Sequence, residues 1–166
     1  MGANLELKKQ VVADIVKKFQ DAKSVVVVRY SGLTVEQATG LREQFRANGV
    51  EYVVLKNTLV RRALADLKIN GLDEALTGPS AFAFGVQDPV SPAKIVNDFI
   101  VKSKTTVLEI KAGLLGSELM TANQVKALAE VPSREVLLAR LFGSLQSSIA
   151  SFVRLLDAIA KQKAEA

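Results

Sequence analysis

From Pro132 to Ala166 the sequence reads PSREVLLARLFGSLQSSIASFVRLLDAIAKQKAEA. After its first residue this stretch contains no proline, and Gly143 is its one glycine. Apolar side chains recur at a spacing that, at about 100° per residue, keeps them within an arc of roughly 120°. They are Leu138, Leu141, Phe142, Leu145, Ile149, Phe152, Val153, Leu156 and Ile159. The pattern predicts one amphipathic helix of about 30 residues and about 45 Å, which begins after an N-cap at Ser133.

The predicted length of this helix divides the chain into two parts. Residues 1–131 would fold into a body roughly 35 Å across, by the usual scaling of size with chain length. A helix of about 45 Å extends beyond contact with such a body. Part of its apolar stripe therefore needs another cover, and exposed stripes of this size mark interaction sites. We expect a globular domain, residues 1–131, and a protruding C-terminal helix, residues 132–166, that binds partner proteins.

Other roles of the C-terminal stretch stay open on the sequence alone. It could be a core helix of its own domain. It could also pair with a second copy as a coiled coil, although its spacing wanders between a heptad and a straight-helix repeat. A membrane-surface helix would want a lysine-rich polar face, and here that face is mostly Ser, Gln and Ala. The longest uncharged run, Leu141 to Val153, is far shorter than the ~20 residues of a membrane span.

The composition excludes several kinds of chemistry. The chain has 166 residues, which suits one domain with an appendage, and it contains neither cysteine nor histidine. Disulfides, thiol nucleophiles, zinc sites built from Cys and His, and histidine acid–base catalysis are therefore ruled out. The formal net charge of +5 makes nucleic acid a candidate partner. The first residues lack the apolar region of a signal peptide, so we expect a cytoplasmic protein, with no metal or cofactor.

The sequence from residue 1 to 131 alternates between two kinds of pattern. Helical spacing and capping signals predict helices over 5–20, 34–48, 57–67, 91–103 and 121–130. Short runs rich in β-branched and apolar residues predict strands over 24–30, 51–55, 80–84 and 106–110. Strands that alternate with helices are typical of an α/β domain. We expect a small sheet of mixed or parallel strands, flanked by helices.

The strongest candidate for a binding site lies where a predicted strand ends and the next predicted helix begins. It is the run from Lys56 to Arg62, which contains a lysine, Asn57, Thr58 and two arginines. Arg61 and Arg62 flank the outward surface of the predicted helix, close to the free backbone N–H groups of its first turn. Arginine forks, a lysine and a helix N-terminus together suit a phosphate group.

Alternatives for this run remain. Asn57 and Thr58 can simply cap the helix while the arginines are solvated. The nearby aromatic residues Tyr30 and Phe45 could stack on a ligand, but both are more typical of a core. A small α/β enzyme acting on a phosphorylated metabolite is a rival function, and the absence of histidine and of a nucleophile motif argues against it.

Four motifs, spread over the chain, form a specific combination. They are Tyr30-x-Gly32-Leu33-Thr34-Val35, Lys56-Asn57-Thr58-Leu59-x-Arg61-Arg62-Ala63, Leu76-Thr77-Gly78-Pro79 and Leu128-Ala129-x-x-Pro132-Ser133-Arg134-Glu135. Together they resemble the bacterial ribosomal protein L-ten family (uL-ten), the stalk-base proteins of the large subunit. The likeness covers essentially the whole chain.

The resemblance implies a function for each part of the chain. In that family the globular part binds large-subunit rRNA beside ribosomal protein L-eleven. The C-terminal helix carries dimers of the acidic stalk protein L-seven/L-twelve, which recruit translation GTPases. The chain would thus be a structural constituent of the ribosome and not an enzyme. The length of the stripe suggests two or more dimers, on about Leu137 to Leu145 and about Ile149 to Ile159, with Gly143 and Ser147-Ser148 as candidate joints.

The resemblance also favours the phosphate-binding interpretation of the basic residues. One departure concerns Arg29-Tyr30-Ser31-Gly32, where the family often has Asp-Tyr-Arg-Gly. Positions 29 and 31 would share a strand face, so the positive charge has moved along that face. The predicted stalk-protein-binding residues are the nine apolar residues of the C-terminal stripe. The predicted rRNA-binding residues are Lys8, Lys9, Arg29, Lys56, Asn57, Thr58, Arg61 and Arg62.

Overall fold

A computed structural model describes residues 3–67, 69, 71–72, 75–103, 108–116 and 118–165, with backbone alone at 3–5, 7, 103, 148–149 and 164–165. The chain divides into two compact units, Met1–Val131 and Pro132–Ala166. The elements of the first unit are α1 (Ala3–Asp21), β1 (Ser24–Tyr30), α2 (Val35–Ala47), β2 (Val50–Val54), α3 (Asn57–Asp66), β3 (Ala81–Gly85), α4 (Ser91–Ser103), β4 (Leu108–Leu115), β5 (Glu118–Thr121) and α5 (Ala122–Glu130). The second unit is the helix α6 (Arg134–Glu165).

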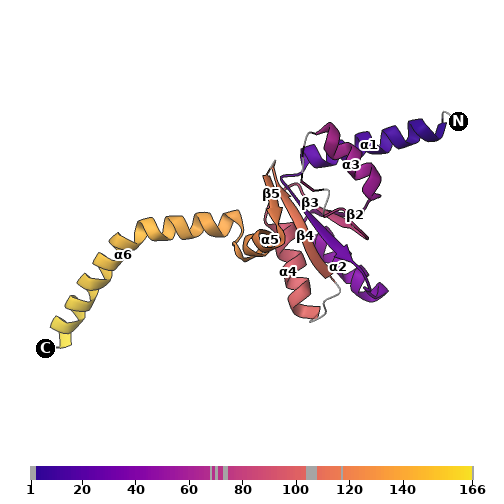
Figure 1. Ribbon diagram of the computed structural model, residues 1–166. Helices are drawn as coiled ribbons and strands as arrows, with labels where there is room; N and C mark the ends of the chain where they lie inside the picture. The colour runs from indigo at the N-terminus through magenta and orange to yellow at the C-terminus, as the bar shows by residue number, and fades with distance from the viewer. Residues whose placement is uncertain are drawn as a thin grey trace. The chain divides into compact units, whose positions relative to one another are not determined.

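The first unit is built around a five-stranded sheet in the order β2-β3-β1-β4-β5 (Figure 1). The α/β class is confirmed, but the expectation of mixed or parallel strands needs correction, because every described pairing is antiparallel. β1 and β2, which α2 connects, do run in the same direction. β3 is inserted between them, and β1 is likewise inserted between β3 and β4. This split β-α-β arrangement follows from pairing between strands that are not consecutive, which a strand–helix alternation leaves undetermined.

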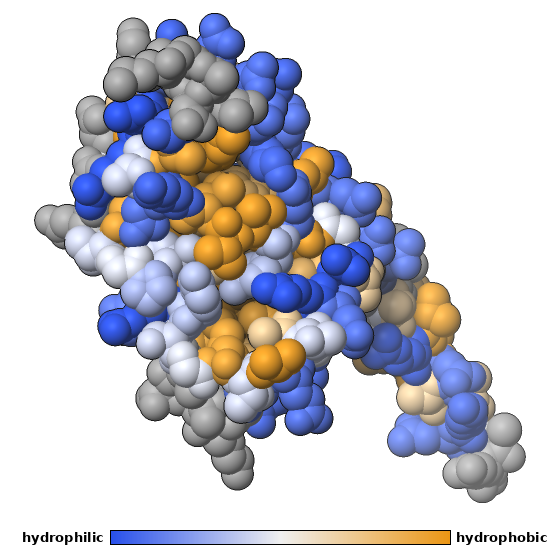
Figure 2. All heavy atoms as spheres, turned by 90° about the vertical axis from the view of Figure 1, so that its right-hand side faces the viewer, coloured by the Kyte–Doolittle hydropathy of each residue, from blue (hydrophilic) through white to orange (hydrophobic). Residues whose placement is uncertain are grey.

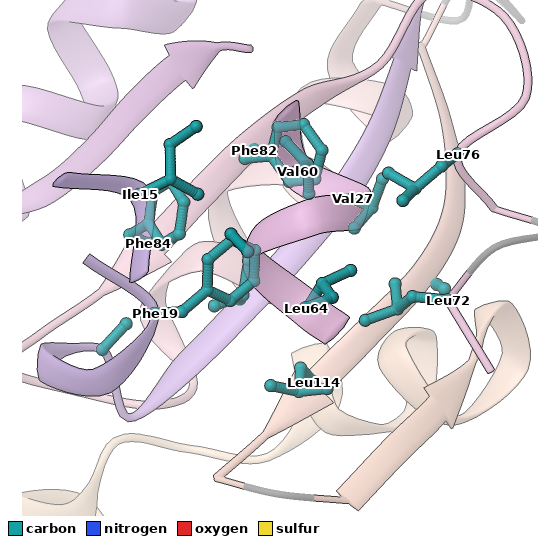
Figure 3. Close-up of a cluster of buried hydrophobic side chains, with 14 residues drawn as sticks. Ile15, Phe19, Val27, Val60, Leu64, Leu72, Leu76, Phe82, Phe84 and Leu114 are labelled. Carbon is teal, nitrogen blue, oxygen red and sulfur yellow. The ribbon is translucent and has the colours of Figure 1, made fainter. Parts of the chain in front are cut away.

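Helices cover both faces of the sheet. α1 and α3 lie on one face, and α2, α4 and α5 lie on the other (Figure 1). Side chains of a strand alternate between faces, so the central strand β1 sends Val25 and Val27 to the first core and Val26 and Val28 to the second. Burial on both faces explains why this strand reads as an unbroken run of valines. The first core is the cluster in Figure 3, where Phe19 of α1 packs edge-on against Phe82 and Phe84 of β3.

The predicted helices of this unit begin and end within a few residues of the observed ones. Thr34 caps α2 as its sequence indicated: its hydroxyl accepts a hydrogen bond from the Gln37 backbone, 3.3 Å, and its own N–H donates to the Gln37 side chain, 3.2 Å. Such reciprocal bonds satisfy two of the amide groups that a helix start leaves free. At the start of α5 the N–H and the hydroxyl of Thr121 both donate to the side-chain oxygen of Gln124, at 2.8 and 3.0 Å.

The largest departure lies between α4 and α5. The sequence predicted a short strand over 106–110, of which residues 106–107 lie outside the described part of the chain. The strand β4 instead continues through Gly113 to Leu115, and a hairpin at Gly116, which has a φ of +60°, leads into β5. A Cβ at position 113 would lie 2.6 Å from Val125 Cγ2 of α5. This glycine therefore permits close helix packing and does not end the strand.

The second unit consists of one helix, as its sequence predicted. α6 spans 32 residues. Its two halves, Arg134–Ser147 and Ala150–Lys163, meet at 49°. Hydroxyl groups of Ser144, Ser147 and Ser151 donate to the carbonyls of Leu141, Ser144 and Ser147, at 2.6–3.0 Å. Serine bonds of this kind compete for helix carbonyls and bend helices. No single helix in the described residues is long and apolar enough to cross a membrane; the two bent halves of α6 pass that test only together, by length and composition alone.

Candidate nucleic-acid and partner interfaces

Basic residues gather at one end of the sheet. β1 and β2 end there, and β3 and β4 begin there, because Val54, Ala81, Val28 and Ile110 are aligned across the four strands. One position further along β1 lies Arg29, which is paired with Glu109 in the register and forms an exposed ion pair with it at 3.9 Å. We call this region, with Arg29, Lys56 and Lys111, the basic end of the sheet.

The start of α3 lies at this end and holds three predicted rRNA-binding residues. Lys56 occupies the N-cap position without capping the helix through its side chain, and both Lys56 and Thr58 are exposed. Asn57 is half-buried, and its side-chain amide donates to the carbonyls of Leu76 and Gly78, each at 2.8 Å. The N–H groups of Asn57 are thus engaged in anchoring the 76–78 turn, and only Lys56 and Thr58 keep exposed side chains for a ligand.

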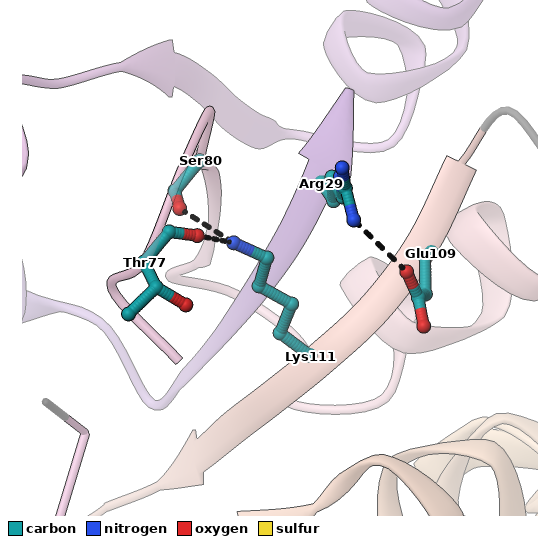
Figure 4. A network of polar contacts seen from close by, with 5 residues as sticks. All are labelled: Arg29, Thr77, Ser80, Glu109 and Lys111. Atoms are coloured by element: carbon teal, nitrogen blue, oxygen red, sulfur yellow. Dashed lines mark hydrogen bonds and ion pairs between the residues drawn. The ribbon is translucent and has the colours of Figure 1, made fainter. Parts of the chain in front are cut away.

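Lys111 of β4 also contacts this turn (Figure 4). Its ammonium donates to the Thr77 carbonyl and to the Ser80 hydroxyl, the latter at 3.2 Å. Burial lowers the pKa of Lys111, as does the charge of Arg29, while Glu109 opposes the shift. Lys111 was not among the predicted residues, because it lies at an irregularity between Val27 and Val28 in the β1–β4 register, which no local motif marks.

The groove between α1 and α3 collects three more of the predicted residues. It has a volume of about 770 Å³ and an apolar floor that includes Val12 and Val16. Figure 2 shows hydrophobic side chains surrounded by hydrophilic ones on the side of the molecule that carries α1 and α3. Arg61 is exposed on α3 and does not line the groove. The cationic side chains along the groove are Lys8, Lys9, Lys17 and Arg62, and Asp66 is the acidic one.

The apolar stripe of α6 is exposed. Side chains of eight of its nine residues are described, and their exposed fractions run from 43% at Leu138 to 65% at Leu145. The side chain of Ile149 lies outside the described residues. Val136, Leu137 and Leu155 are exposed as well, so the apolar surface is broader than the predicted stripe. Exposed apolar surface of this extent is typical of an interaction site.

Known proteins similar to this chain match both of its units. A family model described as "Ribosomal protein L10" matches residues 3–101, and one described as "Ribosomal protein uL10 C-terminal region" matches residues 131–166. The "Large ribosomal subunit protein uL10" of Shouchella clausii is 50% identical over 99% of this chain and 98% of its own length. Proteins of the same name from Bacillus cereus and Bacillus licheniformis are 47% and 44% identical over the same shares. The chain therefore belongs to the uL10 family of large-subunit ribosomal proteins.

Proposed function

We propose that the first unit binds large-subunit rRNA, beside ribosomal protein L-eleven, and that α6 carries dimers of the acidic stalk protein L-seven/L-twelve. The single observation that carries the proposal is the exposed apolar face of α6, which contrasts with the two buried hydrophobic cores of the first unit. Through the stalk dimers, the chain would present translation GTPases to the ribosome.

The RNA-binding part rests on where the exposed cations lie. Arg29 and Lys56 lie at the basic end of the sheet, while Lys8, Lys9 and Arg62 line the α1–α3 groove. α3 connects the two areas, because Lys56 precedes its first turn and Arg62 follows within the same helix. Phosphate contacts from such dispersed cations position a protein on folded RNA without reading its sequence.

The stalk-binding part rests on the bend of α6. The bend divides the exposed stripe into one stretch at about residues 137–145 and another at about 149–159, which agrees with two dimers. Covering the stripe would contribute on the order of 10 kcal/mol or more before ordering costs. The net positive charge of the chain, +5, suits an acidic partner.

Deletion of residues 134–166 tests the division of labour. The shortened chain keeps both cores of the first unit, so it should bind an rRNA fragment with nearly unchanged affinity and lose all binding of purified L-seven/L-twelve. Mobility-shift assays and size-exclusion chromatography would measure the two activities. Loss of RNA binding by a folded, shortened chain would contradict the proposal.

Self-association through α6 is the second candidate, because an exposed apolar helix face can also pair with its own copy. Light scattering of the full chain, alone and with L-seven/L-twelve, separates the two. A monomer that forms a heteromeric complex supports the stalk proposal, whereas a stable homo-oligomer that ignores the acidic protein supports self-association. The rival enzyme interpretation is set aside, because the family is one of ribosomal proteins.

A further inference from the structure

A cavity separate from the α1–α3 groove opens at the basic end of the sheet, on the face that α2 covers. It has a volume of about 360 Å³, within the usual range for small-ligand pockets. Its walls come from the end of β1, the loop before α2, α2 itself and the edge strand β2. The residues that matter for its chemistry are Tyr30, Gly32, Leu33, Arg42 and Tyr52.

A neighbouring cavity of about 480 Å³ follows β2. The two share Arg42, Tyr52 and Val54 as lining residues, and the second one adds Arg46, one turn further along α2. Their linings together include aromatic and apolar side chains and two exposed arginines of α2. Glu51 is the one acidic residue that lines either cavity within the described part of the chain.

The aromatic wall packs against the core. The Tyr52 ring stacks on Phe45, with 5.0 Å between ring centroids and 6° between planes, and Phe45 is fully buried. Burial raises the pKa of Tyr52, and the nearby charge of Arg42 acts in the opposite direction. The Tyr52 hydroxyl therefore keeps its proton at neutral pH and can donate a hydrogen bond. No hydrogen bond or ion pair among the described residues uses the side chains of Tyr30, Arg42 or Tyr52.

We propose that this cavity receives one unstacked base of the bound RNA, which lies against the aromatic rings of Tyr30 and Tyr52, while Arg42 and Arg46 hold the adjacent phosphates. This inference rests on the proposed RNA binding and names a recognition element within it. Proteins that recognise folded RNA bind bases splayed out of loops and bulges, and they stack them on aromatic rings or arginine planes. Gly32, with a φ of +88°, borders the cavity without a side chain, so a nucleotide can approach the backbone closely there.

The position of the cavity favours RNA over a protein side chain. Tyr30 follows Arg29 at the end of β1, and its ring lies on the α2 face with Val26 and Val28, so the base would be bound on the same side of the sheet as Arg42 and Arg46. Arg42 and Arg46 repeat on one side of α2, which suits a chain of phosphates. The sequence favoured a core position for Tyr30; in the structure it packs against the second core and is half-buried at the edge of the cavity.

The test compares Tyr30→Leu, which removes the ring, with Tyr30→Phe, which keeps it, in the full chain. The probe is a large-subunit rRNA fragment that the unaltered chain binds. Tyr30→Leu should bind about 10-fold more weakly, while Tyr30→Phe should bind nearly as well as the unaltered chain. Because no phosphate contact is lost, the dependence of affinity on salt should be the same for both. Arg42→Gln should reduce that slope by about one.

Abasic substitutions in the RNA identify the base. At one unpaired position, removal of the base should weaken binding by the unaltered chain at least as much as Tyr30→Leu does, and Tyr30→Leu should cost nothing further on that abasic RNA. Equal affinities for folded Tyr30→Leu and Tyr30→Phe variants would overturn the inference, as would additivity at every unpaired position. Unchanged RNA affinity together with weakened L-eleven binding would assign the cavity to a protein and also overturn it. A chain that binds no rRNA at all would overturn the proposed function first.

Discussion

Two amphipathic helices of this chain, α1 and α6, differ in what covers their apolar faces. Phe19 of α1 is 6% exposed, because it packs against β3, whereas Phe152 of α6 is 62% exposed. Both helices carry the same kind of residue at the same kind of spacing. The hydrophobic pattern therefore predicts an apolar helix face but not what buries it. Whether the chain's own core or a partner protein buries that face depends on the tertiary structure.

A core substitution should have the largest effect on the first unit. Phe82→Ala removes a fully buried ring that contacts Phe19 and Phe84, and we expect it to reduce the free energy of unfolding by about 3–5 kcal/mol. Urea denaturation would measure the change. The matched variant Phe152→Ala should leave the first unit unchanged, because that ring is exposed on α6. Equal destabilisation by both would show that α6 belongs to the same core.

The next effect concerns α6 and its partner. Phe142→Ala should weaken the stalk dimer on the first stretch of α6 by about 2 kcal/mol, because a ring that the partner covers would be lost. Native mass spectrometry should then show one dimer fewer at limiting concentration of L-seven/L-twelve, with the second dimer retained. Gln146→Ala, an exposed polar position on the same helix, is the control. Loss of both dimers from Phe142→Ala would show that the two stretches do not act independently.

Charge removal should act on the first unit alone. The affinity for rRNA falls as salt rises, and replacing Arg61 and Arg62 by Ala should make this dependence weaker. The magnitude of the slope of log affinity against log salt should decrease by about 0.9 for each lost phosphate contact. The affinity of the double variant for rRNA at moderate salt should fall roughly tenfold. Arg154→Ala removes one arginine from α6 and should leave the slope unchanged. An unaltered slope in the Arg61 and Arg62 variant would place both residues outside the RNA interface.

The smallest effects come from a pair of glycines and have opposite signs. Gly143→Ala should stabilise the helical state of α6 by about 0.5–1 kcal/mol and so raise its helicity. The added Cβ has space, because no neighbouring atom lies within 4 Å of it. Gly113→Ala should instead cost at least about 1 kcal/mol, since its Cβ would meet Val125 at 2.6 Å. Circular dichroism during thermal unfolding would measure both. A loss of α6 helicity in Gly143→Ala would contradict the open surroundings of that position.

Local signals explain what could be predicted of the fold. The capping residues Thr34 and Gln37 marked the start of α2, and the run of valines marked β1, because both act over a few neighbouring residues. The strand order and the β4–β5 hairpin could not be predicted, since they depend on which distant strands pair. The predicted strand over 106–110 ended too early, because the sequence does not show that Gly113 lies within β4 under a closely packed helix.

For the candidate site, the sequence could supply residue types but not neighbours. Lys56, Arg61 and Arg62 are exposed cations, as the sequence indicated. The structure adds that the Asn57 side chain anchors the turn at residues 76–78. Lys111 and the Tyr30–Tyr52 cavity were missed, because their members come from different strands. Whether the selected residues contact RNA stays a prediction.

The sequence by itself determined the α/β class, the length of α6, its apolar stripe and the family of the chain, because periodicity, capping and motifs are local properties. Only the tertiary structure decided that the sheet is antiparallel, that Lys111 and Asn57 hold one turn between them, and that Tyr30 borders an open cavity. Those features depend on contacts between residues far apart along the chain. Their free energy comes from packing and hydrogen bonds that exist only once the strands have paired.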